Sequence, residues 1–215
     1  MTPVICLITD RHRLGEAWEP ASIQRVRAAA RAGVHLIQVR ERDLAGGALA
    51  HLTEQSLDAV RGTRARVVVN DRLDVALAVS AHGVHLRGDS IDAARIRRIA
   101  PAGFLIGRSV HSVEEALAVS GNGAVDYLVF GSVFETSSKL GRKAAGLHAL
   151  GAVSTATTVP VLAVGGISAS RAGAVALAGA SGLAAIGLFT DAPVDAVQGI
   201  VEQITTAFDT PERVP

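Results

Sequence analysis

The chain has 215 residues, of which 49% are apolar and 3% aromatic, and its formal net charge at pH 7 is +1. The length suits one large domain or two small ones, and the balanced charge argues against nucleic acid or an acidic membrane surface as a partner. The single cysteine, Cys6, excludes an intrachain disulfide and a thiolate zinc cluster, and we expect it to be a small buried residue.

Short runs of Val, Ile and Leu recur along the chain without polar alternation, which is typical of strands buried on both faces of a parallel sheet. They predict strands at Val4–Ile8, Leu36–Val39, Val67–Val69, Gly83–Leu86, Phe104–Ile106, Tyr127–Phe130, Val161–Val164 and Leu183–Ile186. The amphipathic segments between them predict helices at Ser22–Arg31, Leu49–Val60, Asp74–Val79, Ala93–Ile99, Val113–Val119, His148–Thr155, Arg171–Ala178 and Val194–Ala207.

This alternation of strand and helix predicts a single (β/α)8 TIM barrel over residues 1–208, with a doubly wound open sheet as the alternative. Residues 209–215 are expected to form a flexible tail. The N-terminus lacks the pattern of a signal peptide, and no apolar run approaches the roughly 20 residues of a membrane span. We therefore expect a cytoplasmic protein.

Polar residues that follow the strands of such a barrel gather at one mouth, where ligands bind. After the second strand, alternation sends Gln38, Arg40 and Arg42 to the same side. Two guanidinium groups at this spacing suit phosphate or pyrophosphate, while surface ion pairs with Glu41 and Asp43 are the alternative.

Glycines follow the last two strands. Gly165 and Gly166 precede a predicted helix, and Gly187 follows the eighth strand. Exposed backbone N–H groups at such positions can cradle a phosphate, although a tight turn would need glycine for its backbone alone. Hydroxyl groups and an ammonium group that suit the same anion follow the sixth strand at Thr136, Ser138 and Lys139.

A histidine follows the fifth strand. His111 lies between Ser109 and Ser112, and it can act as a general acid and base or simply bond to the start of a helix. Asn70 and Asp71 follow the third strand and can help to hold Mg²⁺ or a pyrophosphate, with helix capping as the alternative.

Taken in order, these motifs resemble the thiamine phosphate synthase/TenI superfamily of (β/α)8 barrels. The resemblance covers nearly the whole chain, through Leu7–Arg11, Gln38–Asp43, Val69–Arg72, Gly83–Leu86, Ile106–Ser112, Asp126–Gly131 and Ala163–Ile167. It implies one of two activities. Synthases couple hydroxymethylpyrimidine pyrophosphate to thiazole phosphate with Mg²⁺, and TenI-type tautomerases isomerise a carboxylated thiazole phosphate without a cofactor.

The chain departs from the synthase pattern after its fourth strand. Synthases usually have Gly-Gln-Glu-Asp there, whereas this chain has Arg87-Gly-Asp-Ser90, so that Ser90 stands at the expected magnesium ligand and Asp89 one place before it. By resemblance, Gly107–Ala116 is similar to TenI-type proteins, whose matching histidine, here His111, transfers the proton. We therefore favour the thiazole tautomerase.

The synthase remains the alternative, because Gln38 and Asn70 keep its pattern, and it would make Asp71 and Asp89 the magnesium ligands. A non-catalytic regulator that binds thiazole phosphate is a third hypothesis. All three take small phosphorylated partners, with pyrimidine pyrophosphate added in the synthase, and none involves nucleic acid or a membrane. The residues leave the oligomeric state open, a homodimer included.

Overall fold

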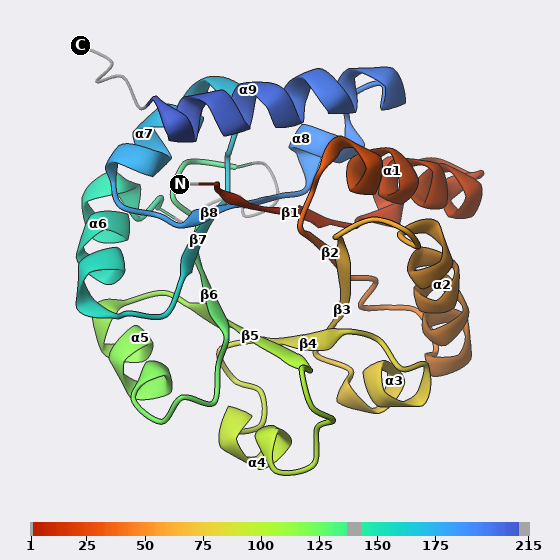
Figure 1. The fold of residues 1–215 in the computed structure, drawn as a ribbon, viewed down its shortest axis with the longest axis horizontal. Helices are drawn as coiled ribbons and strands as arrows, with labels where there is room; N and C mark the ends of the chain where they lie inside the picture. Colours follow the sequence, from red (N-terminus) through yellow and green to blue (C-terminus); the bar gives the residue numbers. More distant parts are fainter. Residues whose placement is uncertain (1, 137–142, 211–215) are drawn as a thin grey trace.

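The computed structural model describes residues 2–136 and 143–210. Its eight parallel strands form one closed barrel in sequence order, with β1 paired to both β2 and β8 (Figure 1). The strands are β1 Val4–Ile8, β2 Leu36–Val39, β3 Arg66–Asn70, β4 Gly83–Leu86, β5 Leu105–Val110, β6 Tyr127–Gly131, β7 Val161–Val164 and β8 Gly182–Ala185. The TIM-barrel prediction is confirmed, and closure of the sheet excludes the doubly wound alternative.

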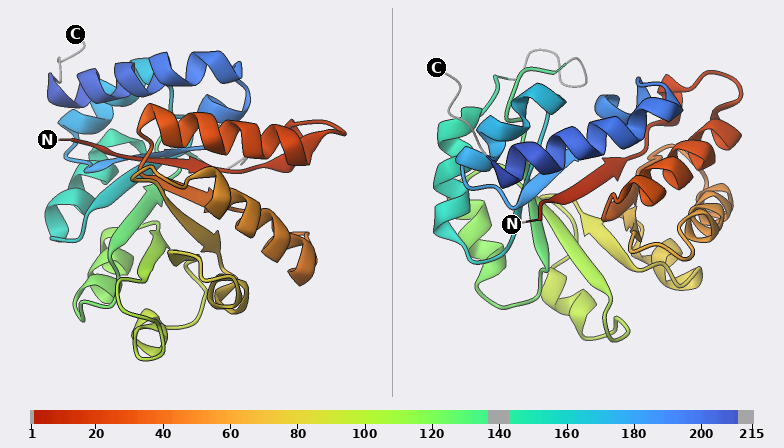
Figure 2. Two further views of the ribbon diagram at one scale, coloured as in Figure 1. Left: turned by 45° about the vertical axis from the view of Figure 1, so that its right-hand side comes forward. Right: turned by 45° about the horizontal axis from the view of Figure 1, so that its top comes forward.

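Helices surround this ring of strands. They are α1 Trp18–Ala32, α2 Gly46–Ala59, α3 Leu73–Ala78, α4 Ala93–Arg97, α5 Val113–Ser120, α6 Gly146–Ala156, α7 Ala172–Leu177, α8 Gly187–Thr190 and α9 Val197–Asp209. Short 3-10 turns occur at Arg11–Arg13, Ala169–Arg171 and Val194–Ala196. Helices α1 and α9 pack side by side, beside the neighbouring strands β1 and β8 (Figure 2).

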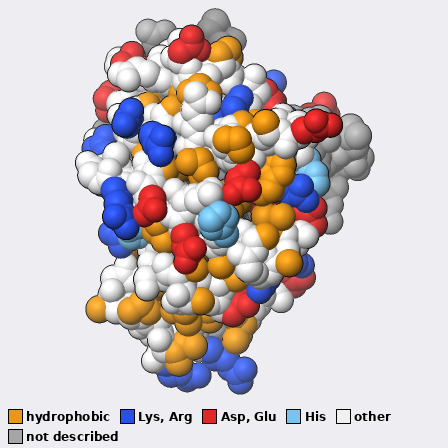
Figure 3. Space-filling model, turned by 90° about the vertical axis from the view of Figure 1, so that its right-hand side faces the viewer, with side chains coloured by type: hydrophobic (Ala, Val, Ile, Leu, Met, Phe, Trp, Pro, Cys, Tyr) orange, Lys and Arg blue, Asp and Glu red, His pale blue; other side chains and the backbone are white. Residues whose placement is uncertain are grey.

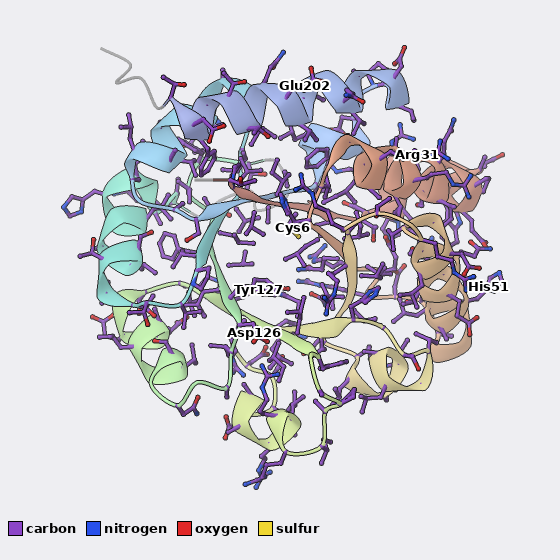
Figure 4. All side chains as sticks on the ribbon, viewed as in Figure 1. Cys6, Arg31, His51, Asp126, Tyr127 and Glu202 are labelled. Atoms are coloured by element: carbon purple, nitrogen blue, oxygen red, sulfur yellow. The ribbon has the colours of Figure 1, made fainter. Side chains whose placement is uncertain are left out.

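The core has two layers because successive strand residues face opposite sides. The larger layer joins outward-facing strand residues such as Ile37 and Val67 to the helices. The smaller one contains only strand residues, namely Cys6, Ile8, Leu36, Val68, Tyr127, Val129, Leu162 and Ala184, and it fills the barrel interior. Figure 4 shows Cys6 and Tyr127 inside the ring of strands, which confirms that the cysteine is a buried residue.

Tyr127 fits inside the barrel because the neighbouring strand carries a glycine. A Cβ at Gly107 would lie 2.1 Å from Cζ of this ring, so that any side chain there would displace the tyrosine. One large side chain beside a glycine therefore contributes to the packing of the barrel interior.

The surface carries mixed charge. Basic and acidic side chains are interspersed over the face drawn in Figure 3, in keeping with the net charge of +1. In the described part of the chain, no helix is both long enough and apolar enough to cross a membrane. The predicted tail begins inside α9, because Asp209 is helical, and residues 211–215 lie outside the described residues.

Candidate active site

A cavity of about 770 Å³ opens at the mouth formed by the carboxyl ends of the strands. The sequence-predicted residues that line it are Gln38, Arg40, Arg42, Asn70, Ser109, Thr136, Gly165, Gly166 and Gly187. Its volume is in the upper part of the range of roughly 300–1,000 Å³ that is usual for ligand pockets. The structure thus brings together residues from six strands that are far apart in the sequence. Ser138 and Lys139 lie outside the described residues.

One side of the cavity carries cationic side chains. Arg40, Arg42 and Arg87 line it from the ends of β2 and β4, and we call these three residues the arginine wall. Arg40 is half-buried, and burial, together with the Arg42 guanidinium, lowers the pKa of Arg40. An anion bound between these side chains would compensate the hydration that Arg40 loses on burial and the repulsion between Arg40 and Arg42.

The opposite side presents backbone. Gly165, Gly166 and Gly187 line it after β7 and β8, and we call these residues the glycine wall. Among the described residues, no acceptor pairs with the N–H group of Gly166. The helices that follow, α7 and α8, are short, so an anion here would be bound by backbone amides rather than by the dipole of a long helix.

The glycine wall is braced by the loop after β6. Phe134 donates its N–H to the Gly165 carbonyl at 3.0 Å, and the Arg171 guanidinium donates to the Gly166 carbonyl at 2.6 Å while lying over the Phe134 ring. A Cβ at Gly166 would lie 2.4 Å from the Glu135 carbonyl oxygen, at a φ of +64°. Glycine is therefore needed here for packing and for the backbone conformation.

The floor between the walls is polar and neutral. His85 is buried, and its Nε2 lies 2.9 Å from Ser109 Oγ while its Nδ1 lies 3.3 Å from the Tyr127 hydroxyl. Burial, with smaller effects from Arg40 and Arg108, lowers the pKa of His85 to about 3. The imidazole therefore stays neutral and can donate or accept a hydrogen bond but holds no charge near pH 7.

Gln38 adds a hydrogen-bond donor to this floor. Its side chain is buried, and its Nε2 atom has no partner among the described residues. A buried amide without a partner is costly, and a ligand acceptor in the cavity would satisfy it.

His111 lies apart from this cavity. It follows the last residue of β5, its side chain is 44% exposed, and it is not among the residues that line the cavity. Its N–H and its Nδ1 both face Glu115 Oε2, at 2.7 and 3.3 Å. The structure thus places His111 at the capped start of α5, and its assignment as a proton-transfer residue stays a prediction.

The two carboxylates expected to bind magnesium are engaged by other groups. Asp71 Oδ1 accepts a hydrogen bond from Ser90 Oγ, and Asp71 Oδ2 lies 3.4 Å from Arg87 Nη1. Asp89 Oδ2 lies 2.5 Å from Arg87 Nη2. Within residues 2–136 and 143–210, no three His, Cys, Asp or Glu side chains gather closely enough to hold a metal ion.

The family model described as thiamine monophosphate synthase matches residues 5–189, most of the chain and all eight strands. The chain belongs to this family. A thiamine-phosphate synthase of Chlorobium luteolum is 36% identical over 208 residues, covering 95% of this chain and 94% of the relative. One from Roseiflexus castenholzii is 39% identical over 191 residues, covering 88% and 82%.

Solved structures agree with this assignment. The thiamine phosphate pyrophosphorylase from Pyrococcus furiosus superposes with a TM-score of 0.81 at 32% identity, covering 96% of this chain and 95% of that one. A 3-hexulose-6-phosphate synthase superposes with a TM-score of 0.71 at only 16% identity, which is a likeness of fold alone. The curated relatives carry the synthase name, so they favour the alternative of the sequence analysis over the tautomerase.

The site also contains residues to which the sequence alone assigned no role. Arg87 and His85 line the cavity, and Arg108 lies in β5 and is buried. Arg87 had a detectable signal, because an arginine replaces the glycine that follows the fourth strand in synthases. His85 had none beyond its position at a strand end.

Proposed function

We propose that this protein is a thiamine-phosphate synthase, which couples hydroxymethylpyrimidine pyrophosphate to thiazole phosphate and releases pyrophosphate. The observation that carries the proposal is the pairing of the arginine wall with the glycine wall across one cavity. A coupling enzyme must hold two phosphorylated substrates that face each other, whereas a tautomerase needs to hold only one phosphate.

Each wall suits one substrate. The guanidinium forks of Arg40 and Arg42 match the several oxygens of a pyrophosphate, which takes bidentate hydrogen bonds. The backbone amides of the glycine wall suit a compact phosphate monoester. Between the walls, the unpaired amide of Gln38 can donate to a ring nitrogen of the pyrimidine. A ring nitrogen buried without a hydrogen-bond donor would lose its hydration without compensation.

The chemistry that follows is a substitution. The thiazole nitrogen attacks the methylene carbon of the pyrimidine, a C–N bond forms, and the C–O bond to pyrophosphate breaks with the electron pair leaving on oxygen. Negative charge grows on the leaving group, so fixed cations beside it lower the barrier. The walls also hold the nitrogen and the methylene carbon in line, which removes much of the entropic cost.

The neutral floor fits this reaction better than a proton shuttle. Neither the bond formed nor the bond broken requires a proton transfer, and His85 with Ser109 supplies only hydrogen bonds. The tautomerase hypothesis depends on His111, which is exposed and paired with Glu115 outside the cavity.

The test is an assay of the purified protein on both substrate sets. We expect thiamine phosphate by mass spectrometry and pyrophosphate by phosphorus NMR when both synthase substrates are supplied, and no isomerisation of carboxythiazole phosphate. Isomerisation without coupling would restore the tautomerase. Tight binding of thiazole phosphate with neither reaction would favour the regulator instead.

A further inference from the structure

Arg87 occupies the place where the family pattern leads one to expect a magnesium ion. Its Nη1 lies 3.4 Å from Asp71 Oδ2, and its Nη2 lies 2.5 Å from Asp89 Oδ2. Asp71 and Asp89 are the two carboxylates left to bind the metal if the protein is a synthase, because Ser90 stands at the second ligand position of the pattern. The guanidinium thus bridges them and also lines the cavity beside Arg40 and Arg42.

A magnesium ion does not fit this arrangement. Both oxygens of Asp71 are engaged, one by Ser90 Oγ and the other by Arg87. The residue at the expected second ligand position is Ser90, which carries no charge, and Asp89 is 71% exposed and turned to the guanidinium. Mg²⁺ demands nearly octahedral oxygen ligands at about 2.0–2.1 Å and would have to sit against a fixed positive charge.

The loop that carries Arg87 is held in place from below. Arg108 is 8% exposed, and its guanidinium donates to the carbonyl oxygens of Gly88, Ser90 and Ile91 at 2.8, 3.2 and 2.8 Å. The Arg87 N–H donates to Ser90 Oγ at 2.9 Å. These bonds hold the backbone that carries Arg87, and the contacts with Asp71 and Asp89 direct its guanidinium, as preorganised electrostatic stabilisation requires.

Arg87 keeps donors for an anion. A guanidinium has five N–H groups in a planar fork, and the contacts with Asp71 and Asp89 use two of them. The side chain is 46% exposed, so its remaining edge can reach the cavity. With Arg40 and Arg42 it can surround a pyrophosphate on three sides, and its own charge is held by the two carboxylates.

We infer that Arg87 supplies the fixed cation for the pyrophosphate of the pyrimidine substrate, so that coupling proceeds without a divalent metal ion. The inference deepens the proposed synthase function and depends on it. The bonds made and broken are unchanged, and the leaving pyrophosphate accepts hydrogen bonds from the three guanidinium groups of the arginine wall.

The first experiment measures inorganic pyrophosphate binding by calorimetry, in EDTA and in excess Mg²⁺. We expect wild-type affinity to be equal within about threefold in the two buffers, because the cation is part of the chain. In Arg87→Met, affinity in EDTA should fall about tenfold or more through loss of a charge-assisted bidentate contact. Arg61→Met is the matched control: it removes an equally charged, exposed side chain that is paired with Asp58 just after α2 and does not line the cavity, so it should bind as wild type does.

The second experiment restores the family pattern. In the double variant Arg87→Gly, Ser90→Asp, the guanidinium is gone and a carboxylate stands beside Asp71. We expect pyrophosphate binding by this variant to require Mg²⁺, with about a tenfold or larger difference between the two buffers. Circular dichroism and thermal unfolding check that each variant is folded.

The outcomes separate the inference from the proposed function. Wild-type binding and coupling that appear only with Mg²⁺ would overturn the inference and leave the synthase intact. A double variant that binds equally well in both buffers would also overturn it. Absence of both pyrophosphate binding and coupling in wild type, with Mg²⁺ present, would sink the proposed function itself.

Discussion

The two walls of the cavity hold anions by different means. The arginine wall uses side chains, one of them half-buried with a lowered pKa, whereas the glycine wall uses backbone amides fixed by the loop after β6. A side chain can be removed without moving the chain that carries it, but a backbone donor cannot. Substitutions in the arginine wall should therefore lower the rate of catalysis, whereas substitutions in the glycine wall should mainly weaken binding or disturb folding.

The largest effect is expected at Arg40. Arg40→Met keeps the length of the side chain but removes the guanidinium nearest to the buried floor, and kcat for coupling should fall about 10²-fold, as is typical when one donor to a developing anion is lost. Steady-state kinetics with the thiazole substrate saturating measures this. An unchanged kcat with a raised KM would mean that Arg40 binds substrate without stabilising the leaving group. Arg61→Met serves again as the control.

His85, in the floor between the walls, should make the free energy of unfolding depend on pH. The folded-state pKa of His85 is about 3, below its ordinary value of 6.5. Between these two values the histidine is protonated in the unfolded chain but neutral in the folded protein. Stability from this source is complete above pH 6.5 and is lost as the pH falls towards 3. By pH 5 the loss amounts to about 2 kcal/mol.

Urea unfolding of wild type and His85→Gln at pH 7.5 and pH 5.0 tests this loss. The variant should lose less stability between the two pH values than wild type does, and His148→Gln, at an exposed histidine, should match wild type. Parallel losses in wild type and His85→Gln would show that other groups control the acid sensitivity.

The barrel was predictable because it depends on repetition. Eight recurring apolar runs separated by amphipathic segments predicted the strands, four of them with the observed bounds, and buried parallel strands leave few alternatives for such a pattern. The sequence did not predict α8 or the extension of β5 to Val110, because Gly187–Thr190 is too short for periodicity and Gly107–Val110 mixes polar with apolar residues.

The site was predictable only in part, for a geometric reason. Position after a strand assigned nine of the described residues to the mouth, since parallel strands bring their ends together. Where a side chain points beyond the strand end depends on local partners that the sequence does not reveal. Glu115 holds His111 outside the cavity, and Asp71 with Asp89 directs Arg87 to the place of a metal.

A smaller effect is expected on the glycine wall, at Gly187. A Cβ there would lie 2.7 Å from Asp191 Oδ2, the far end of an exposed side chain that is paired with Arg13, so that the two side chains would have to shift together. Gly187→Ala should fold and bind thiazole phosphate about tenfold more weakly, because the methyl group intrudes on the phosphate. Gly166→Ala is a poorer probe, since its Cβ would meet the Glu135 carbonyl at 2.4 Å.

Calorimetric titration with thiazole phosphate measures the Gly187 effect, and Gly47→Ala is the matched control. A Cβ at Gly47 meets nothing within 4 Å at the start of α2, so this variant should bind as wild type does. If Gly187→Ala kept wild-type affinity for thiazole phosphate while Arg40→Met lost it, the assignment would be reversed. Thiazole phosphate would then bind at the arginine wall and the pyrimidine pyrophosphate at the glycine wall.

The smallest effect is expected at His111, the residue on which the tautomerase hypothesis depends. A synthase needs no proton shuttle, and the His111 side chain is 44% exposed, faces Glu115 and lies outside the cavity. His111→Asn should therefore change kcat for coupling by no more than about twofold, far below the 10²–10⁴ that general acid–base catalysis contributes. Steady-state assays of coupling measure the kcat of this variant. Glu115→Gln, which alters the same surface pair, is assayed for comparison. A loss of about 10²-fold in His111→Asn alone would show that the imidazole takes part in coupling and that the site extends to the start of α5.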